Sequence, residues 1–518
     1  MYCSVSNIKN WLLNDPILDY LKLYGDKNKQ SSTFFNQCNF SSFILDMGNK
    51  YEEVVVNNLI NKCEINELSY CTVERKTGYQ STKEALAKKI DVIFQAQVKD
   101  WNRNVTGYPD IMIKKSALMK IFDMSNVNDK IKVKLNAIKD NDYIIIDIKY
   151  SSLDSTDGIL DEKSKYHRYI KSQICMYSIL GKCKPNLAFI ISKDRSSIIT
   201  PIAFFIDEPL VIDCTKGVNW YFKVIKEGMN WSLDKEEDAY QILPNMNNVY
   251  DSEWRDYKRE IAIKYKEISL ISGIGDILRD KLRNNNIYTY DNPLFIETLG
   301  KCIDKESKMF KRICIIRDNL LNPTNILFKN ELSSLTSTTY VYIDIETCTK
   351  FTLTNENRNY LISISIHYNG VSKCFIVDEL SQANEEVIIN EFKNELQMLS
   401  KDKDIVLVHY SSVEDKFFKR INIDYPSIDL YSILTNEFDK VNEDVVKLCV
   451  YDLSLKSVVN KLKDVYGECK IKNGLEVLAA YQKEINDEIK NEIIKYNIAD
   501  CIALQVLHSY FIQIKLLI

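Results

Sequence analysis

Two stretches of the chain, DYIIIDIKY and YVYIDIET, share one pattern of apolar and charged positions. β-branched and aromatic residues fill each run, which is typical of a buried strand. Each run ends in two charged residues that lie two positions apart: Asp147 with Lys149, and Asp344 with Glu346. Side chains two apart on a strand project from the same face. The pattern therefore predicts two buried strands, each with a charged pair on one face.

Helical periodicity is clearest near the two ends of the chain. Residues 1–60 are predicted to be helical, and within them Glu52 lies one turn after Gly48, ahead of an apolar stripe. Near the C-terminus, apolar residues recur at helical spacing around Tyr496 and Asp500. Because these two residues are four apart, a helix places both on one face.

Changes in pattern along the chain predict its division into domains. Residues 1–235 and 338–518 are each expected to form an α/β domain with a central mixed sheet. The highly charged stretch after the first domain predicts a helical connector over residues 236–330. The small polar residues of Leu332–Thr339 predict a linker directly before the last domain.

Composition narrows the class of protein. The chain has 518 residues, of which 45% are hydrophobic and 27% charged, as in ordinary soluble globular proteins. It shows no bilayer-spanning apolar run and no signal-peptide pattern, so we expect a soluble protein of the cytoplasm or nucleus without a membrane partner. The net charge of −4 argues against a uniformly basic nucleic-acid coat, but it leaves local basic channels open.

Cysteine usage and nucleotide motifs exclude further classes. The 14 cysteines are scattered and form no CxxC pair, so we expect neither a disulfide scaffold nor a zinc site or iron–sulfur cluster. The chain also lacks a GxxxxGK[ST] motif, and it therefore carries no visible nucleotide motor. If the protein acts together with a helicase, we expect that helicase to be another chain.

The two charged pairs differ in the chemistry that they indicate. Two acids side by side on an apolar strand, such as Asp344 and Glu346, are costly to bury unless a cation neutralises them. Paired oxygen ligands on a rigid strand suit Mg²⁺ or Mn²⁺. The alternative is a strand that ends at the surface with two solvated acids. For Asp147 and Lys149, the choice is between a catalytic lysine and a structural ion pair at a strand end.

Acidic residues further along the chain complete a known motif together with Asp344 and Glu346. The DxE of Asp344 and Glu346, a middle acid at Glu414, and the YxxxD of Tyr496 and Asp500 resemble the tyrosine-containing branch of the DEDD exonucleases, which have the RNase H-like fold. The segments LSLKSVVNKL and GLEVLAAY resemble the RNase H-like nuclease domain that follows a RecB-type nuclease in some bacterial and viral proteins.

This resemblance implies roles for particular residues. Asp344, Glu346, Glu414 and Asp500 would hold two metal ions, and Tyr496 would orient the attacking water. The exonucleases usually carry Asn and then Asp in the middle motif, whereas this chain has Tyr410 and Glu414 there. That departure leaves Asp415 open as a competing ligand.

The strand that carries Asp147 and Lys149 is part of a second family motif. Glu52, Asp110 at the start of a strand after GYP, and the DxK of Asp147 and Lys149 resemble the PD-(D/E)XK nucleases, more narrowly the RecB type. Gln173 and Tyr177 match the QxxxY helix of that group. By this resemblance Asp110 and Asp147 bind a metal ion with help from Glu52. Lys149 positions or activates the water, while Gln173 and Tyr177 contact substrate or brace the site.

Two further segments are candidates for nucleic-acid contact. In KSKYHRYIKSQ, the basic residues Lys165, Arg168 and Lys171 are interleaved with tyrosines, which suits a single strand; solvated charges on a helix are the alternative. The segment ISGIGDILRDKL resembles a helix–hairpin–helix, in which the loop of Gly273 and Gly275 would bind a backbone phosphate.

Together these patterns predict a multidomain α/β protein in which a restriction-endonuclease-like domain and an RNase H-like domain are joined by a helix–hairpin–helix-like middle. The leading hypothesis is a nuclease, dependent on Mg²⁺ or Mn²⁺, that hydrolyses DNA in repair, recombination or replication. RNA stays open as a substrate. A second hypothesis is that only the N-terminal site cuts and the C-terminal domain is a binding platform. The third is a non-catalytic scaffold for a helicase complex.

Overall fold

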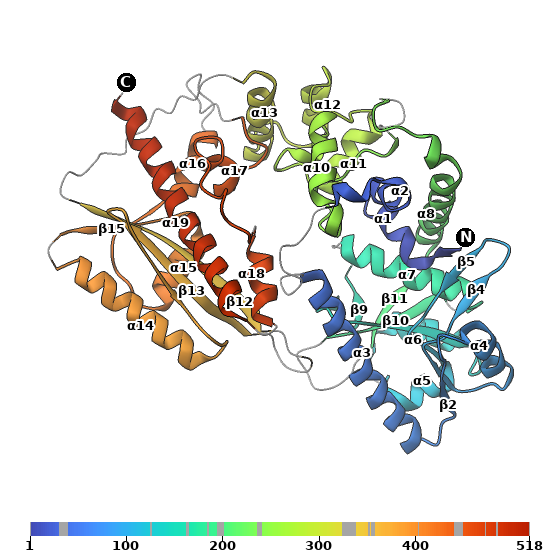
Figure 1. Ribbon diagram of the computed structural model, residues 1–518. Coiled ribbons are helices and arrows are strands. Elements are labelled where there is room, and N and C mark those ends of the chain that lie inside the picture. Colours follow the sequence, from blue (N-terminus) through green and yellow to red (C-terminus); the bar gives the residue numbers. More distant parts are fainter. Residues whose placement is uncertain are drawn as a thin grey trace. The chain divides into compact units, whose positions relative to one another are not determined.

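The computed structural model divides into two compact units. The first unit is built mainly from Met1–Ser31 and Ser41–Ile261, and the second from Ala262–Phe351 and Asn357–Ile518 (Figure 1). The structure describes residues 2–30, 40–124, 127–161, 165–183, 186–193, 201–235, 241–323, 338–350, 353, 358–401, 403–439, 449–471, 473–482 and 485–516. The predicted connector is thus divided between the two units, and residues 332–337 of the predicted linker lie outside the described residues.

A mixed sheet forms the centre of the first unit. Among the described residues it has eight strands in the order β2-β3-β6-β7-β10-β11-β9-β8. These are β2 (Tyr70–Thr72), β3 (Val92–Phe94), β6 (Ile111–Lys114), β7 (Tyr143–Lys149), β8 (Ser155–Thr156), β9 (Ile159–Leu160), β10 (Leu187–Ser192) and β11 (Ile202–Phe205). The central strand β7 runs antiparallel to β6 and parallel to β10. A second, smaller sheet pairs β1 (Cys3–Ser4), β5 (Val105–Gly107) and β4 (Val98–Asp100).

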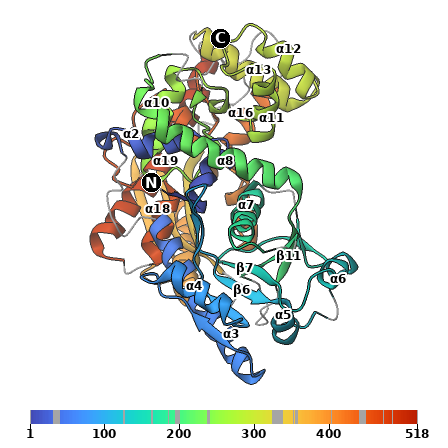
Figure 2. The same ribbon diagram turned by 90° about the vertical axis from the view of Figure 1, so that its right-hand side faces the viewer.

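Helices cover both faces of the large sheet. They are α1 (Lys9–Leu12), α2 (Ile17–Tyr24), α3 (Phe40–Ile65), α4 (Gly78–Ala87), α5 (Lys115–Ile121), α6 (Asp129–Asn136), α7 (Lys165–Leu180) and α8 (Glu208–Glu227), with α10 (Arg255–Lys264) at the boundary of the unit. Figure 2 shows α7 lying between α8 and the sheet. The short strand β1 interrupts the N-terminal stretch that the sequence predicts to be helical.

The alternation along β7 decides where its charged pair points. Ile145 packs in a core with Ile174 and Tyr177 of α7, whereas its neighbours Ile144 and Ile146 pack in the opposite core, which includes residues of α3. Asp147 and Lys149 share the alternation of Ile145 and therefore face α7.

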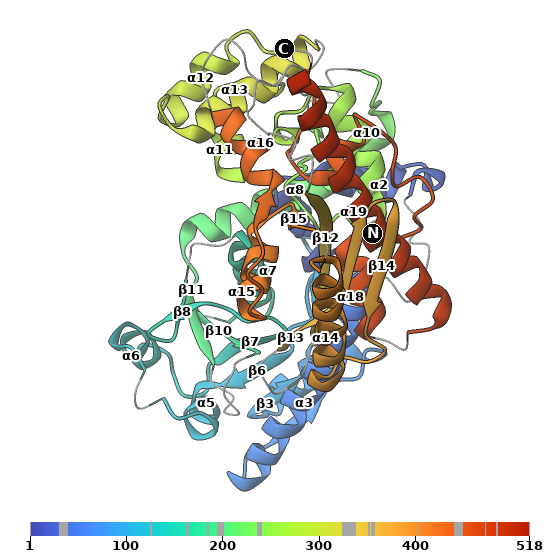
Figure 3. The same cartoon turned by 90° about the vertical axis from the view of Figure 1, so that its left-hand side faces the viewer.

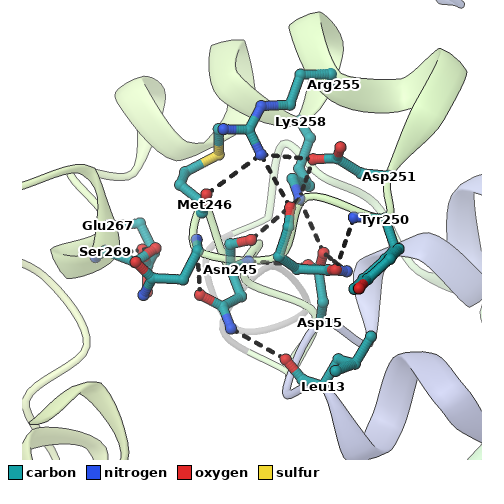
Figure 4. A network of polar contacts seen from close by, with 12 residues as sticks. Leu13, Asp15, Asn245, Met246, Tyr250, Asp251, Arg255, Lys258, Glu267 and Ser269 are labelled. Carbon is teal, nitrogen blue, oxygen red and sulfur yellow. Dashed lines mark hydrogen bonds and ion pairs between the residues drawn. The ribbon is translucent and has the colours of Figure 1, made fainter. Parts of the chain in front are cut away.

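A buried polar network ties the N-terminal segment to residues beyond the predicted end of the first domain (Figure 4). The Lys258 ammonium is fully buried and donates to Asp15 Oδ2 at 2.9 Å and to the Asn245 carbonyl at 3.0 Å. It also forms an ion pair with Asp251. A buried lysine in an apolar interior is tolerated only when it is paired in this way. The first unit therefore continues past residue 235.

The second unit also centres on a mixed sheet. Within the described ranges it has five strands in the order β14-β13-β12-β15-β16. These are β12 (Thr339–Lys350), β13 (Arg358–Tyr368), β14 (Val371–Ile376), β15 (Ile405–His409) and β16 (Ser427–Asp429). Strand β12 is antiparallel to β13 and parallel to β15. The helices of this unit are α11 (Asp276–Asn284), α12 (Phe295–Cys302), α13 (Lys308–Leu321), α14 (Gln382–Leu399), α15 (Ser412–Arg420), α16 (Leu430–Asp439), α17 (Leu455–Val459), α18 (Gly474–Gln482) and α19 (Asp487–Leu516).

The polar positions of β13 face the last helix. The Ser363 hydroxyl donates to Asn497 at 3.0 Å, and His367 lies 3.1 Å from Gln505, so this face of the sheet carries α19. Helix α14 packs against β13 and β14, as seen in Figure 3. No helix in the described part of the chain combines the length and the apolar character that a membrane crossing needs.

Candidate functional site

Three carboxylates converge in the second unit, and we call them the acidic trio: Asp344 and Glu346 of β12 with Asp500 of α19. One oxygen of each lies within 4.8 Å of the others, and no other group of His, Cys, Asp or Glu among the described residues meets that criterion. The strand register explains the convergence. Asp344 and Glu346 stand opposite Ser365 and Ser363, and Ser363 lies on the face that carries α19. A β-bulge follows Glu346 and ends this regular alternation.

Hydrogen bonds hold two members of the trio from the side. The Asn497 amide donates to Asp344, and its oxygen accepts from Ser363. The Tyr466 hydroxyl donates to Asp500 Oδ1 at 2.5 Å. Sequence reasoning missed both residues. Asn497 could have been found because it directly follows Tyr496, whereas Tyr466 lies 34 residues before Asp500 in a loop segment without a distinctive pattern.

The trio is electrostatically unfavourable when it holds no cation. Burial, followed by the charges of Asp500 and Glu414, raises the pKa of Glu346 to about 8. The pKa of Asp344 is raised well above its usual range by burial and then by its acidic neighbours. Burial raises the pKa of Asp500 to about 6, although the bond from Tyr466 opposes this. No lysine or arginine in the described residues forms an ion pair with the trio. Three oxygen donors that repel each other fit a hard divalent cation.

Glu414, the predicted fourth ligand, lies beside the trio and outside the 4.8 Å group. It is buried on α15, and its Oε2 accepts from the Ser411 hydroxyl at 2.7 Å. Its charge nevertheless raises the pKa of Asp344 and of Glu346. The competitor Asp415 is more exposed and lies 3.2 Å from His409 Nε2. Of the two acids, Glu414 is the one whose charge acts on the trio.

Tyr496, the predicted water-orienting residue, lies one helical turn before Asp500 and is buried. Burial, and then the charges of Asp500 and Glu346, raise the pKa of its hydroxyl. Its ring lies 6.4 Å from that of Tyr466. The Lys456 ammonium lies 4.7 Å from the centroid of the Tyr466 ring and 5.8 Å from that of Tyr496. Lys456 also lowers the pKa of Asp500, as a secondary cause. It belongs to the LSLKSVVNKL segment, but that pattern did not single it out.

A second cluster forms in the first unit, and we call it the lysine-paired cluster: Glu52, Asp110, Asp147 and Lys149. The Lys149 ammonium lies 2.6 Å from Asp147 Oδ2. Asp110 Oδ2 accepts the backbone N–H of Ile148 at 2.6 Å. Burial, then Asp147 and also Glu52, raise the pKa of Asp110 well above its usual range, while Lys149 opposes the shift. The four residues therefore converge from α3, the β6 entry and β7.

Other side chains position this cluster. The Gln173 amide donates to the Tyr177 hydroxyl at 2.7 Å, and both residues are buried on α7. Burial and then the charge of Asp147 raise the pKa of Tyr177. Sequence reasoning missed Gln95. Its backbone N–H donates to the Asp110 carbonyl at 2.7 Å, and its side chain donates to Glu52 at 3.0 Å.

The basic residues of the KSKYHRYIKSQ segment are less accessible to a nucleic acid than their sequence suggests. Arg168 forms an ion pair with Asp213, and Lys171 is buried. Both line a pocket of about 210 Å³ that also contains Asp207 and Asp213. Lys165 lies on α7, but its side chain is outside the described residues.

The predicted phosphate loop adopts the conformation of a helix entry. Gly273 has a φ of +96°, which favours glycine, and Gly275 is the N-cap of α11. Arg279 of that helix is fully buried and donates to Glu267 at 2.8 Å, so it faces the interior. Phosphate binding by this loop stays a prediction.

Comparison with known proteins bears on the second unit. A family model described as the RNase_H superfamily matches residues 341–512. These residues form an RNase H-like domain. A family B DNA polymerase from the hyperthermophilic archaeon Pyrobaculum calidifontis is 14% identical over 36% of this chain and 25% of the polymerase, with a TM-score of 0.26, which is too low to carry an argument. No curated protein matches the chain. The family match lies outside the first unit, so the likeness of that unit to PD-(D/E)XK nucleases stays a prediction.

Proposed function

We propose that the protein is a metal-dependent nuclease that hydrolyses phosphodiester bonds of DNA. The observation that carries the proposal is the acidic trio in an RNase H-like domain. Three acids whose pKa values are all raised, and which form no ion pair with a lysine or arginine among the described residues, make a site suited to a divalent cation. Mg²⁺ or Mn²⁺ is the expected ion because all donors are carboxylate oxygens. The RNase H-like fold adds the expectation that nucleic acid is the ligand.

At the trio, each residue has a defined task in the proposed reaction. Asp344, Glu346 and Asp500 would hold the ion, which supplies Lewis-acid stabilisation of the phosphoryl oxygens when bound. Tyr496 would orient the attacking water by its hydroxyl. Tyr466 and Asn497 would be positioning residues, because they hydrogen-bond the carboxylates that would hold the ion.

The lysine-paired cluster supports a second cutting site, in the first unit. Asp110 and Asp147 would hold a metal ion with help from Glu52. Lys149 already contacts Asp147 and would position a water or stabilise developing negative charge as a point charge. Gln173 and Tyr177 would brace this site through their mutual hydrogen bond. The proposed enzyme thus has one hydrolytic site in each unit and acts in repair, recombination or replication.

One observation favours a second candidate for the RNase H-like domain. Glu414 accepts a hydrogen bond from Ser411 and lies outside the trio. The site therefore assembles three acids, whereas a site for two metal ions would use four. A domain with a single ion would bind nucleic acid as a platform while the first unit cuts.

End-labelled single- and double-stranded DNA, incubated with Mg²⁺ or Mn²⁺, separates these candidates. The unaltered protein is compared with Lys149→Ala, Asp500→Ala and the double variant. Asp129→Ala and Lys132→Ala are controls, because they alter an exposed ion pair of α6. Two product patterns, each removed by one variant, support two sites. Loss of all cutting in Lys149→Ala alone supports the platform. If no form cuts DNA or RNA, the nuclease proposal is wrong and a scaffold remains.

A further inference from the structure

Three aromatic side chains from separate segments gather around one lysine at the surface of the first unit. Tyr2 precedes β1, Tyr79 lies on α4, and Trp101 follows β4. The Lys99 ammonium lies 5.7, 5.8 and 5.3 Å from the ring centroids of Tyr2, Tyr79 and Trp101. The Trp101 ring meets each tyrosine edge-on at 5.8 Å. We call these four residues the aromatic patch. The β4–β5 hairpin that carries Trp101 lies beside α4 in Figure 1.

The patch does not serve the core of the unit. Trp101 is 55% exposed and Tyr2 is 40% exposed, although large aromatic side chains normally bury most of their surface. Trp101 is also the only tryptophan of the chain that is exposed by this measure, and all five tryptophans lie in the described residues. Because these rings stay exposed, the group is a candidate binding surface.

The charges around the patch favour an anionic ligand. The Lys83 ammonium lies 5.8 Å from the centroid of the Tyr79 ring, and Arg103 is exposed in the hairpin turn, where its guanidinium lies 3.7 Å from Asp100. The nearby acid Asp100 is turned to the hairpin itself, where it accepts the backbone N–H groups of Asn102 at 2.9 Å and Arg103 at 3.2 Å. Lys99 makes no ion pair with an acid in the described residues.

The patch is joined to the lysine-paired cluster through β5. Asn104 in the hairpin turn and Asp110 are six residues apart, so their Cα atoms are separated by at most about 21 Å. Gly107 lies between them and against Tyr177, because a Cβ there would come within 2.7 Å of the tyrosine ring. Gln97 stiffens the connection, since its backbone N–H donates to Thr82 of α4 at 2.9 Å and its amide donates to Tyr108 at 2.7 Å.

We propose that the aromatic patch binds single-stranded nucleic acid and leads it toward the lysine-paired cluster. Unpaired bases offer faces that stack on tyrosine and tryptophan, and phosphates meet the ammonium of Lys99. A duplex keeps its base faces stacked internally and cannot use the rings in this way. The proposal rests on the proposed nuclease function, since it names the form of the substrate that the first unit takes.

Binding without metal tests the patch separately from cutting. Fluorescence anisotropy of labelled oligo(dT) and of a hairpin duplex is measured in EDTA. Trp101→Leu keeps an apolar side chain and removes the stacking ring, whereas Trp101→Phe keeps a ring. We expect Trp101→Leu to weaken oligo(dT) binding about 5- to 150-fold, the range for one lost stacking contact. Trp101→Phe should lose less, and duplex binding should not change. Tyr70→Leu is the control, because Tyr70 is an exposed aromatic of the same unit outside the patch.

Tryptophan fluorescence gives a second readout. Oligo(dT) should quench the emission of Trp101, and Trp101→Phe should abolish that quenching, because the other tryptophans are buried or half-buried. Trp11, Trp220 and Trp231 form a separate stack with centroid distances of 5.4 and 5.7 Å. If the Trp101 variants show unchanged affinity for oligo(dT) and unchanged quenching, the proposal that the patch binds single-stranded nucleic acid is wrong. Metal-dependent cutting would then still stand by itself, whereas binding without any cutting would overturn the nuclease and keep the patch.

Discussion

Each of the two acid clusters contains a strand with charged residues at positions i and i+2, β7 in the first unit and β12 in the second. The clusters differ in how the negative charge of these residues is balanced. In the first unit the second residue is Lys149, which lies 2.6 Å from Asp147. In the second unit it is Glu346, and the trio has no basic ion-pair partner among the described residues. With an ammonium in place of one carboxylate, the first cluster is partly neutralised from within, whereas the trio is suited to an external cation.

This difference has consequences for stability and for metal dependence. The lysine-paired cluster can fold without metal, since its central acid is already paired. The trio carries mutual repulsion that only protonation or a bound cation removes. Metal removal should therefore affect the second unit more than the first, and single substitutions should move the two clusters in opposite directions.

The largest expected effect follows from Lys149→Met. Asp147 is 1% exposed at its side chain and would lose its ion-pair partner, so we expect the first unit to lose about 3–5 kcal/mol of unfolding free energy. The variant removes the ammonium beside Asp110 and Asp147, so that this cluster, like the trio, consists of acids without a basic ion-pair partner. Mn²⁺ should then restore stability, as measured by hydrogen exchange at β7. Lys114→Met, which breaks the Asp91 pair, is the control that Mn²⁺ should not rescue. Equal rescue of both variants contradicts the comparison.

Removing a positioning hydroxyl from the trio should weaken metal binding. Tyr466→Phe deletes the hydrogen bond to Asp500, and loss of a residue that orients a metal ligand typically costs about 10- to 100-fold in affinity. Titration calorimetry with Mn²⁺ measures this loss. Tyr481→Phe removes a buried hydroxyl that bonds the Val377 carbonyl, away from any ligand, and should leave the affinity unchanged. The role of Tyr466 is refuted if the two variants bind Mn²⁺ alike.

A charge-removing substitution in the trio should stabilise the metal-free second unit. Glu346→Gln relieves repulsion with Asp500, so we expect a gain of about 1–2 kcal/mol at pH 8, opposite in sign to Lys149→Met. Hydrogen exchange at β12 in EDTA reports this gain. Slower exchange in the unaltered protein than in the variant would show that the repulsion is already compensated.

The last prediction is the pH dependence of metal binding. The pKa of Glu346 is raised to about 8, so at pH 6 the metal-free residue is protonated and must release its proton to bind a cation. Affinity for Mn²⁺ should rise with pH up to about 8, by at most about tenfold per pH unit for one proton. The metal-free unit should instead lose stability over this range, because its folded state holds more protons than the unfolded chain. Calorimetry in two buffers of different ionisation enthalpy counts the released protons.

Local periodicity was sufficient to predict the two strands and the C-terminal helix that carry the acids of the two clusters. The alternation along β7 and β12 and the four-residue spacing of Tyr496 and Asp500 appear in the structure as expected. Partners that approach from other segments were not predictable. Gln95 and Tyr466 act through hydrogen bonds that depend on how loops and helices pack, whereas Asn497 could have been found because it directly follows Tyr496. The inward direction of Arg279 also follows only from the tertiary structure, since a charged residue on a short helix is normally solvated.

The sequence by itself determined which strands and helices carry charged pairs, because a strand repeats every two residues and a helix every 3.6. It also indicated an RNase H-like domain over residues 338–518, and the family match over residues 341–512 confirms that character. Only the tertiary structure decided that Glu414 is hydrogen-bonded to Ser411, that the first unit continues past residue 235, and that Tyr2, Tyr79 and Trp101 share one surface. These features depend on contacts between residues far apart in the chain, and short-range patterns of polarity contain no information about such contacts.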